Sequence, residues 1–188
     1  MMSGPGENRL AFYGRTGGRR AIILRIMLMK RNYMSPVVLD KTDRKILSLL
    51  QADGRMTNAE LAQRINLSPS ACLRRVQRLE ESAVIAGYVA LVRQEAVGRP
   101  TSIFVEVTLK SQSEESLKAF ERAVRACPDI MECYLMSGDA DYLIRVVAAD
   151  TQDYERIHKQ HLTRLPGVAR IRSSFALRAI SKKTALDI

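Results

Sequence analysis

The sequence predicts an α+β protein in which three helices, two of them forming a helix-turn-helix, precede a domain with the element order β-α-β-β-α-β. Apolar residues recur at helical spacing from Leu39 to about Ser82, and period-two alternation begins after Pro100. The length of 188 residues gives room for one or two small domains, each with its own core.

Charge and cysteine content narrow the class of protein. The net charge is +10, but residues 1–35 hold seven Lys or Arg and one Glu, a net of +6, so most of the basicity lies in that segment. Cys72, Cys127 and Cys133 show no metal-ligand spacing, which predicts free thiols in a reducing cytosol and no metal site. No apolar run reaches the roughly 20 residues that a membrane span needs.

Residues 1–35 do not fit the pattern of either domain. The segment 14–20 is rich in Gly and Arg, and the short apolar run 21–29 is not followed by a small-residue cleavage site. We expect a disordered or weakly helical extension, or a mis-annotated start with Met34 as the initiator.

The first helix of the three-helix unit follows Leu39. Asp40 and Asp43 lie at its front, where acids interact favourably with the positive end of the helix dipole. Ile46 and its helical-spacing neighbours Leu49 and Leu50 supply the apolar face, and 53–54 (Asp-Gly) ends the helix.

The second and third helices form the predicted helix-turn-helix. Residues 58–65 make one helix, with Leu61 and Ile65 on its inner side. Asn66 tolerates the left-handed backbone of a helix end, and Ser68 followed by Pro69 is a helix start signal.

The third helix carries the candidate DNA contacts. Cys72, Val76 and Leu79 fall on its inner face. Small residues near its start let the helix approach base edges, and guanidinium groups bind guanine or phosphate, so each arginine is expected to contribute base or phosphate contacts. The candidate DNA-binding residues are Ser68, Ser70, Ala71, Arg74, Arg75 and Arg78. The alternative is an ordinary helical hairpin with a solvated basic face.

The rest of the chain alternates strands and helices. Residues 85–91 predict a strand that leaves the helical unit, and 93–98 a hinge. Beyond Pro100 the expected elements are a strand ending at Leu109, a helix opened by Ser113 and ended by Pro128, strands 130–136 and 141–149 around a turn, a helix capped by Thr151, and a strand over 168–180. This order is the split βαβ arrangement, an antiparallel sheet with two helices on one face.

Several of these stretches, in this order, resemble one family. The chain is similar to the Lrp/AsnC family of feast-or-famine transcriptional regulators in the stretches NAELAQRINLSPSACLRRVQRLE, ECYLMSGDADYLIRV and LTRLPGVARIRSSFAL. In detail these stretches most resemble the members that regulate branched-chain keto acid and amino acid catabolism. The resemblance covers about residues 39–188. The hinge has Arg93-Gln94-Glu95 where members often carry Asn or Asp with Pro, and Ala71 and Arg74 also depart from the family pattern.

The resemblance implies a winged-type helix-turn-helix over 36–84, a hinge strand or linker over 85–98, and a ferredoxin-like effector and oligomerisation domain over 99–188. It implies binding to double-stranded DNA, a homodimer that assembles into tetramers or octamers, and a small amino acid effector bound between dimers. It implies no other cofactor and a cytoplasmic, nucleoid-associated location. The implied effector-binding residues are Met136, Gly138, Asp139, Asp141, Tyr142, Ser173 and Ser174.

The chemistry of this region suits a zwitterion. Gly138 allows close backbone approach, Asp139 or Asp141 can accept from the ammonium, and the two serine hydroxyls can donate to the carboxylate. Because side chains alternate along a strand, only one of Leu135 and Met136 lines the site, and Met136 is favoured. The alternative is a plain hairpin turn.

Two other function classes remain open in the sequence. An enzyme is disfavoured because no catalytic triad, acid pair or cofactor loop is present, and His158 and His161 lack a carboxylate–histidine signature. A non-specific, chromatin-like DNA-packing protein is the other alternative, and it differs from a regulator in its preference for one DNA sequence. The effector, the direction of regulation, the operator and the oligomer size are not readable from the sequence.

Overall fold

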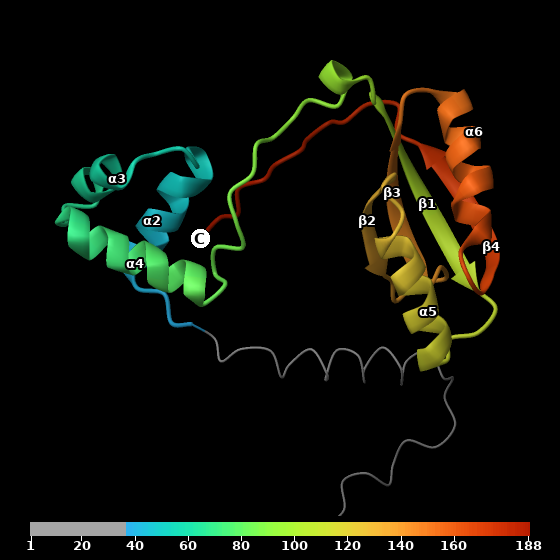
Figure 1. The fold of residues 1–188 in the computed structure, drawn as a ribbon, viewed down its shortest axis with the longest axis horizontal. Helices are drawn as coiled ribbons and strands as arrows, with labels where there is room; N and C mark the ends of the chain where they lie inside the picture. The colour runs from blue at the N-terminus through green and yellow to red at the C-terminus, as the bar shows by residue number, and fades with distance from the viewer. Residues whose placement is uncertain (1–36) are drawn as a thin grey trace, which may run out of the picture. The chain divides into compact units, whose positions relative to one another are not determined.

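The computed structural model describes residues 37–188, so residues 1–36, including the predicted extension, lie outside it. The described chain divides into a helical unit, 37–97 with 177–188, and a sheet unit, 98–176. The ribbon in Figure 1 shows the elements of each unit. Within residues 37–188 no helix has the length and apolar character that a membrane crossing requires.

Three helices build the helical unit, as the sequence predicts: α2 (Lys41–Ala52), α3 (Asn58–Arg64) and α4 (Pro69–Glu81). Their apolar stripes meet in one core, because residues three and four apart share a helix face. Its fully buried members include Ile46, Leu61, Cys72 and Leu79. The predicted inward faces of all three helices are therefore confirmed.

Local signals set the helix ends. Asp40 caps α2 and Thr57 caps α3, each in a reciprocal capping box with the acid three residues later. Ser68 accepts from the Ala71 N–H at the start of α4, and Pro69 is its first residue. Asn66 adopts φ 56°, the left-handed conformation expected at that helix end.

The predicted strand over 85–91 is wrong for this chain. Ile85 instead finishes the helical unit: its N–H donates to the Leu79 carbonyl at 3.0 Å, and its side chain packs on the helical core. The following residues carry apolar side chains but have no ladder partner among residues 37–188, and a strand requires one. The only regular structure in the predicted hinge is a short 3₁₀ helix, η1 (Glu95–Val97).

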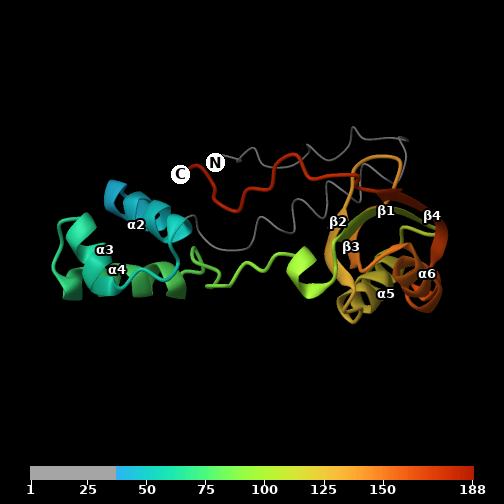
Figure 2. The same cartoon turned by 90° about the horizontal axis from the view of Figure 1, so that it is seen from above.

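The sheet unit has the predicted β-α-β-β-α-β order. Its strands are β1 (Thr101–Leu109), β2 (Ile130–Leu135), β3 (Tyr142–Ala148) and β4 (Val168–Phe175), and its helices are α5 (Glu114–Arg125), α6 (Thr151–Gln160) and the 3₁₀ helix η2 (Leu162–Arg164). The sheet order is β2-β3-β1-β4, and neighbouring strands are antiparallel. Figure 2 shows α5 and α6 on the same face of the sheet.

One face of the sheet is closed and the other is open. Ile103, Val105 and Val107 alternate toward the helices and are fully buried with Phe120 of α5 and Ile157 of α6. The residues between them in β1 point to the other face, which no helix of the sheet unit covers.

The last twelve residues differ from expectation. The predicted strand to residue 180 ends at Phe175, and residues 177–188, assigned from sequence to the C-terminal domain, group with the helical unit. The Gln51 side chain holds this tail by both ends of its amide. Its Nε2 donates to the Leu186 carbonyl at 3.0 Å, and its Oε1 accepts from the Leu186 N–H at 2.6 Å.

Candidate nucleic-acid interface and effector region

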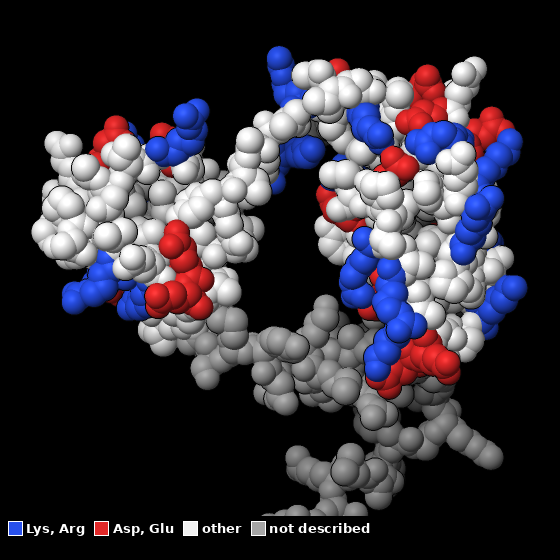
Figure 3. Space-filling model, in the orientation of Figure 1, with Lys and Arg blue, Asp and Glu red and all other residues white. Residues whose placement is uncertain are grey.

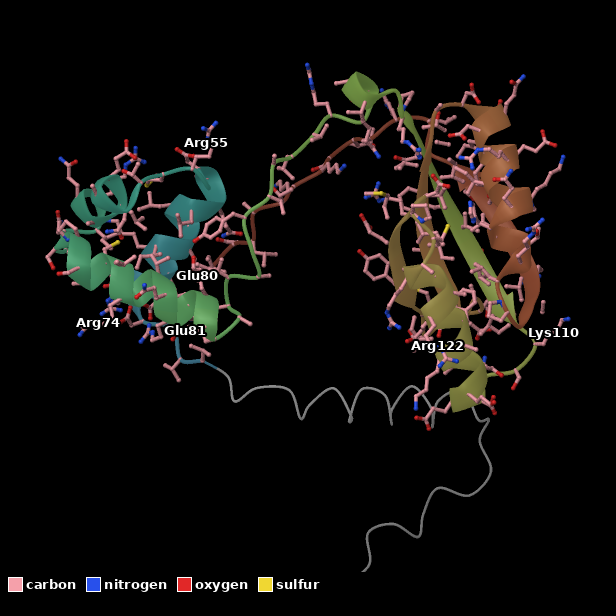
Figure 4. All side chains as sticks on the ribbon, in the orientation of Figure 1. Arg55, Arg74, Glu80, Glu81, Lys110 and Arg122 are labelled. Atoms are coloured by element: carbon pink, nitrogen blue, oxygen red, sulfur yellow. The ribbon has the colours of Figure 1, made fainter. Side chains whose placement is uncertain are left out.

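The outer face of α4 is the candidate DNA-reading surface. Cys72 and Leu79 bury the opposite side of this helix, so residues half a turn away face outward. Ser70 and Arg74 are exposed there, and Asn58 fixes the start of the helix by donating from Nδ2 to the Pro69 carbonyl at 2.8 Å. Figure 4 labels Arg74 on this helix, with Glu80 and Glu81 nearer its C-terminal end.

The three arginines of α4 do not share one environment. Nη1 of Arg75 lies 2.7 Å from an oxygen of Asp40 and 2.8 Å from one of Asp43, and Arg78 pairs with the second oxygen of Asp43. Arg74 is exposed and takes no part in these ion pairs. Arg75 and Arg78 therefore tie α4 to the first turn of α2.

The acids at the start of α2 serve two purposes at once. Asp40 and Asp43 close the capping box through their own backbone N–H groups and also receive the guanidinium groups of α4. The Asp43 side chain is completely buried by this arrangement. The backbone N–H of Asp43, followed by the Arg75 guanidinium, lowers the pKa of Asp40 to about 2, because both stabilise the ionised carboxylate.

One outward residue of α4 was missed in the sequence. Gln77 is exposed and lies three residues after Arg74, on the same side of the helix. Its amide can both donate and accept, as an adenine edge requires. The helical period alone places Gln77 on the outer face, beside Arg74. Figure 3 shows basic and acidic side chains side by side on the surface of this unit.

The turn between β2 and β3 holds the first part of the predicted effector region. The Met136 N–H donates to the Asp141 carbonyl at 2.9 Å and closes this turn. Met136 and Asp139 are exposed, and a side chain added at Gly138 would meet no atom, so this tip is open.

Asp141 and Tyr142 lie in the sheet unit's interior. The Asp141 carboxylate accepts from the Leu109 N–H at 2.7 Å and from Nε2 of Gln112 at 2.6 Å, and the residue is 6% exposed. Tyr142 is 1% exposed; its ring centroid is 4.5 Å from that of Phe120. Burial, helped by the charge of Glu121, raises the pKa of Tyr142.

The two serines of β4 point to opposite faces. Ser173 pairs with Val105 on the helix side and shares a hydrogen bond with the Tyr154 hydroxyl of α6. Ser174 pairs with Phe104 and is exposed on the open face. A ligand on either face of the sheet can therefore contact only one of the two serines.

The structure does not bring the turn and the serines together. Tyr142, Val107 and Ile171 are level across the sheet, and Ser173 lies two residues further along β4. Two strand spacings of about 4.8 Å and two residues of about 3.4 Å put the two sets about 12 Å apart or more. The ammonium nitrogen and carboxylate carbon of a free amino acid are only about 2.5 Å apart.

Comparison with known proteins identifies both units. A family described as winged helix-turn-helix DNA-binding matches residues 39–85, and one described as Lrp/AsnC ligand binding domain matches residues 102–186. The chain is 43% identical over 147 residues to the Bkd operon transcriptional regulator of Pseudomonas aeruginosa, covering 78% of this chain and 96% of that protein. The chain belongs to the Lrp/AsnC family.

Two further relatives agree. The leucine-responsive regulatory protein of Escherichia coli K12 is 39% identical over 150 residues, covering 80% of this chain and 92% of that protein. A transcriptional regulator of Neisseria meningitidis, solved as a complex with L-Met, has a TM-score of 0.75 and 36% identity, covering 80% of this chain and 97% of that one. This Lrp/AsnC protein is thus a DNA-binding transcriptional regulator with an amino-acid-binding domain, and the enzyme alternative is set aside because its relatives and domains are those of regulators.

Proposed function

We propose that this regulator reads a specific DNA sequence with the row Ser70, Arg74 and Gln77 of α4, while Arg75 and Arg78 hold that helix on α2. The ion pairs of the helical unit carry this assignment of roles. Arg75 and Arg78, which act as braces between α4 and α2, have carboxylate partners there, whereas Arg74 takes no part in these pairs. An exposed guanidinium and amide one helical turn apart suit adjacent base edges in a major groove. Ser68 would contact the phosphate backbone, and the small side chain of Ala71 would let the helix come close to the DNA.

Binding to a labelled fragment of the protein's own promoter region, compared with a scrambled fragment at physiological salt, tests this proposal. A specific regulator should prefer its site by about 10³ or more. Equal affinity for both fragments, with a steep salt dependence, would instead support the chromatin-like alternative. Fluorescence anisotropy of the full chain measures both quantities in one titration series.

We propose further that a small amino acid binds at the tip of the β2–β3 turn, with Asp139 as the acceptor for its ammonium group. Between the two acids offered by the sequence, Asp139 is favoured because the Asp141 carboxylate already accepts from Leu109 and Gln112. The separation of about 12 Å between turn and serines favours a site between copies, in which Ser174 of one chain serves the turn of another. The L-Met complex of the Neisseria relative supports this ligand class.

A thermal-shift screen of the free amino acids tests the effector proposal. A ligand that prefers the native state raises its stability with concentration, by about 2.7 kcal/mol at a hundredfold excess over Kd. An unshifted melting temperature with every amino acid would contradict the proposal and leave DNA reading untouched.

We propose a homodimer as the basic assembly, with tetramers or octamers built from it. The open face of the sheet exposes Phe104 and Tyr134, 40% and 53% accessible, and the linker exposes Val89 at 83%. Exposed aromatic side chains on a sheet face that no helix of the unit covers are typical of interaction sites. Light scattering coupled to size exclusion gives the mass; a monomer at all concentrations would contradict the proposal.

The proposed targets are genes of amino acid catabolism, as the sequence resemblance implies; the Pseudomonas relative is named as the regulator of the Bkd operon. Since its ligand is the chromosome, we propose a cytoplasmic, nucleoid-associated location. Chromatin immunoprecipitation with the native protein tests both, and enrichment that ignores such genes would contradict the assignment.

A further inference from the structure

Three side chains of metal-ligating types meet in the sheet unit: two lie close together in sequence, and the third comes from more than thirty residues later. Cys127 follows the end of α5, Asp129 lies in the loop before β2, and His161 is the residue after α6. One ligand atom from each, a thiol sulfur, a carboxylate oxygen and an imidazole nitrogen, all lie within 4.8 Å of one another. This group is separate from the DNA-reading face and from the effector turn, and its members have no spacing that would reveal it in the sequence.

The carboxylate of Asp129 is held in a fixed orientation. It is 7% exposed, and its Oδ1 accepts from Nη1 of Arg99 at 2.8 Å. Its other oxygen, Oδ2, lies 3.7 Å from Nε2 of His161. One oxygen is therefore occupied by a guanidinium, and the other faces the imidazole. Carboxylates that ligate metals are commonly hydrogen-bonded by a second group in this way.

We propose that Cys127, Asp129 and His161 bind a divalent metal ion of the zinc type, with the thiolate, Oδ2 and the imidazole as ligands and water in the fourth position. Sulfur and nitrogen donors of this kind select zinc over the hard cations magnesium and calcium. Cys127 and Asp129 are buried while His161 is partly exposed, so the ion has a route from solvent along the imidazole side.

The surrounding charges limit the affinity without excluding the ion. Arg156 also approaches Oδ2, with its Nη2 at 3.7 Å, but the same nitrogen is 2.7 Å from Oδ1 of Asp153. On binding, the Cys127 S–H bond breaks, its proton passes to buffer, and a metal–sulfur bond forms. The thiolate and the Asp129 carboxylate then balance the two positive charges of the ion.

A bound ion would link the ends of two helices. It would join the C-terminal end of α5 to that of α6 through the loop before β2, and so close a long stretch of chain between Cys127 and His161. Metal would therefore stabilise the sheet unit, whichever amino acid the regulator senses and whichever DNA it reads.

Cobalt is the probe for the test, because thiolate-bound Co²⁺ has a charge-transfer absorption that carboxylate or imidazole ligation lacks. Reduced, chelator-treated full-length protein is titrated with Co²⁺ near neutral pH, then with Zn²⁺. We expect a saturable thiolate band at one ion per chain that Zn²⁺ abolishes. Cys127→Ala should lose the band, and His161→Gln should weaken binding about tenfold or more.

The chain supplies a matched control for each variant. Cys133→Ala removes a second thiol of the same unit, and burial, with the charge of Glu121, raises the pKa of Cys133 to about 11. His158→Gln changes the other histidine, three residues earlier on α6. Both controls should keep the band and the affinity of the unmodified chain.

Three results would overturn the proposal. They are the absence of a thiolate band in the unmodified protein, a band that survives Cys127→Ala, and a band that is lost in Cys133→Ala or His158→Gln. Circular dichroism checks that each variant folds. Should Cys127→Ala fail to fold, the pair His161→Gln and His158→Gln decides the matter, because both residues are partly exposed.

Discussion

The DNA-reading face and the effector region differ in how their side chains are assembled. Ser70, Arg74 and Gln77 come from one helix, so the helical period alone sets their spacing. The effector residues come from a turn and from a strand two places away in the sheet, and one chain leaves them about 12 Å apart. The proposed reading row is therefore complete in each chain, whereas the proposed effector site depends on sheet register and, by our proposal, on a second copy.

The largest effect is expected where the helical unit fixes its reading helix. Asp43→Ala removes a fully buried carboxylate and leaves Arg75 and Arg78 with fewer partners. Charge-assisted bonds of this kind suggest a loss of about 2–3 kcal/mol in the free energy of unfolding. Denaturant melts of the full chain measure it.

Glu81→Ala, which removes an exposed acid at the end of α4, is the control for Asp43→Ala and should change stability by less than about 0.5 kcal/mol. Equal losses in the two variants would show that the ion pairs between α2 and α4 contribute nothing specific.

Next in size is the contrast between the arginines. Arg74→Ala should weaken promoter binding by about 1–3 kcal/mol, roughly 5- to 150-fold. It should leave the melting temperature unchanged, because Arg74 takes no part in the ion pairs that join α4 to α2. Arg75→Ala should lower the melting temperature, because it removes the guanidinium partner of Asp40 and leaves Asp43 with Arg78 alone.

The salt dependence of binding separates the two roles. Arg75→Ala should keep the log–log slope of the unmodified chain, whereas loss of a phosphate contact reduces that slope by about one. A reduced slope for Arg75→Ala with full thermal stability would contradict its role as a brace and return it to the DNA-contact set.

Prediction from sequence succeeded where the signals were local. Ser68 with Pro69 predicted the start of α4, and Asn66, which has the left-handed backbone, predicted the turn before it. The βαββαβ order followed from apolar alternation in the same way. The strand over 85–91 failed because a strand needs a partner, and periodicity does not show whether one exists.

The limits at the sites have the same physical origin. The helical period places Arg74 and Arg75 about 100° apart, but it does not tell that Asp40 and Asp43, more than thirty residues earlier, lie beside Arg75. Asp141 is comparable: the sequence places it as an exposed turn acid, and its contacts with Leu109 and Gln112 show that it is structural. Contacts between residues distant in sequence therefore decide which polar side chains remain available to bind a ligand or DNA.

A smaller effect separates the acids of the effector turn. Asp141→Asn weakens two hydrogen bonds in the sheet unit and should cost about 1–2 kcal/mol in stability, whether or not an amino acid is present. Asp139→Asn should leave stability unchanged and remove the amino-acid-dependent rise in melting temperature. If Asp139→Asn retains the full ligand shift, Asp139 is not the acceptor.

The smallest effect concerns acid. The pKa of Asp40 is lowered from 3.8 to about 2, so the unfolded chain binds more protons than the folded chain between these values. The stability contributed by this carboxylate is therefore complete above about pH 4 and is lost as the pH falls toward 2. Asp40→Asn should flatten the acid limb of the stability curve in this window, as followed by circular dichroism.

Glu81→Gln is the matched control for the acid titration, because it removes a carboxylate of the same helical unit and should keep the steep limb. If the Asp40 and Glu81 variants lose stability in parallel with the unmodified chain, the bonds that Asp40 accepts from the Asp43 N–H and from Arg75 have no energetic weight. Asp43 would then be the only acid that holds α4 on α2. The position of the reading helix would depend on one buried carboxylate of the same helical unit, and no second copy of the chain would be needed.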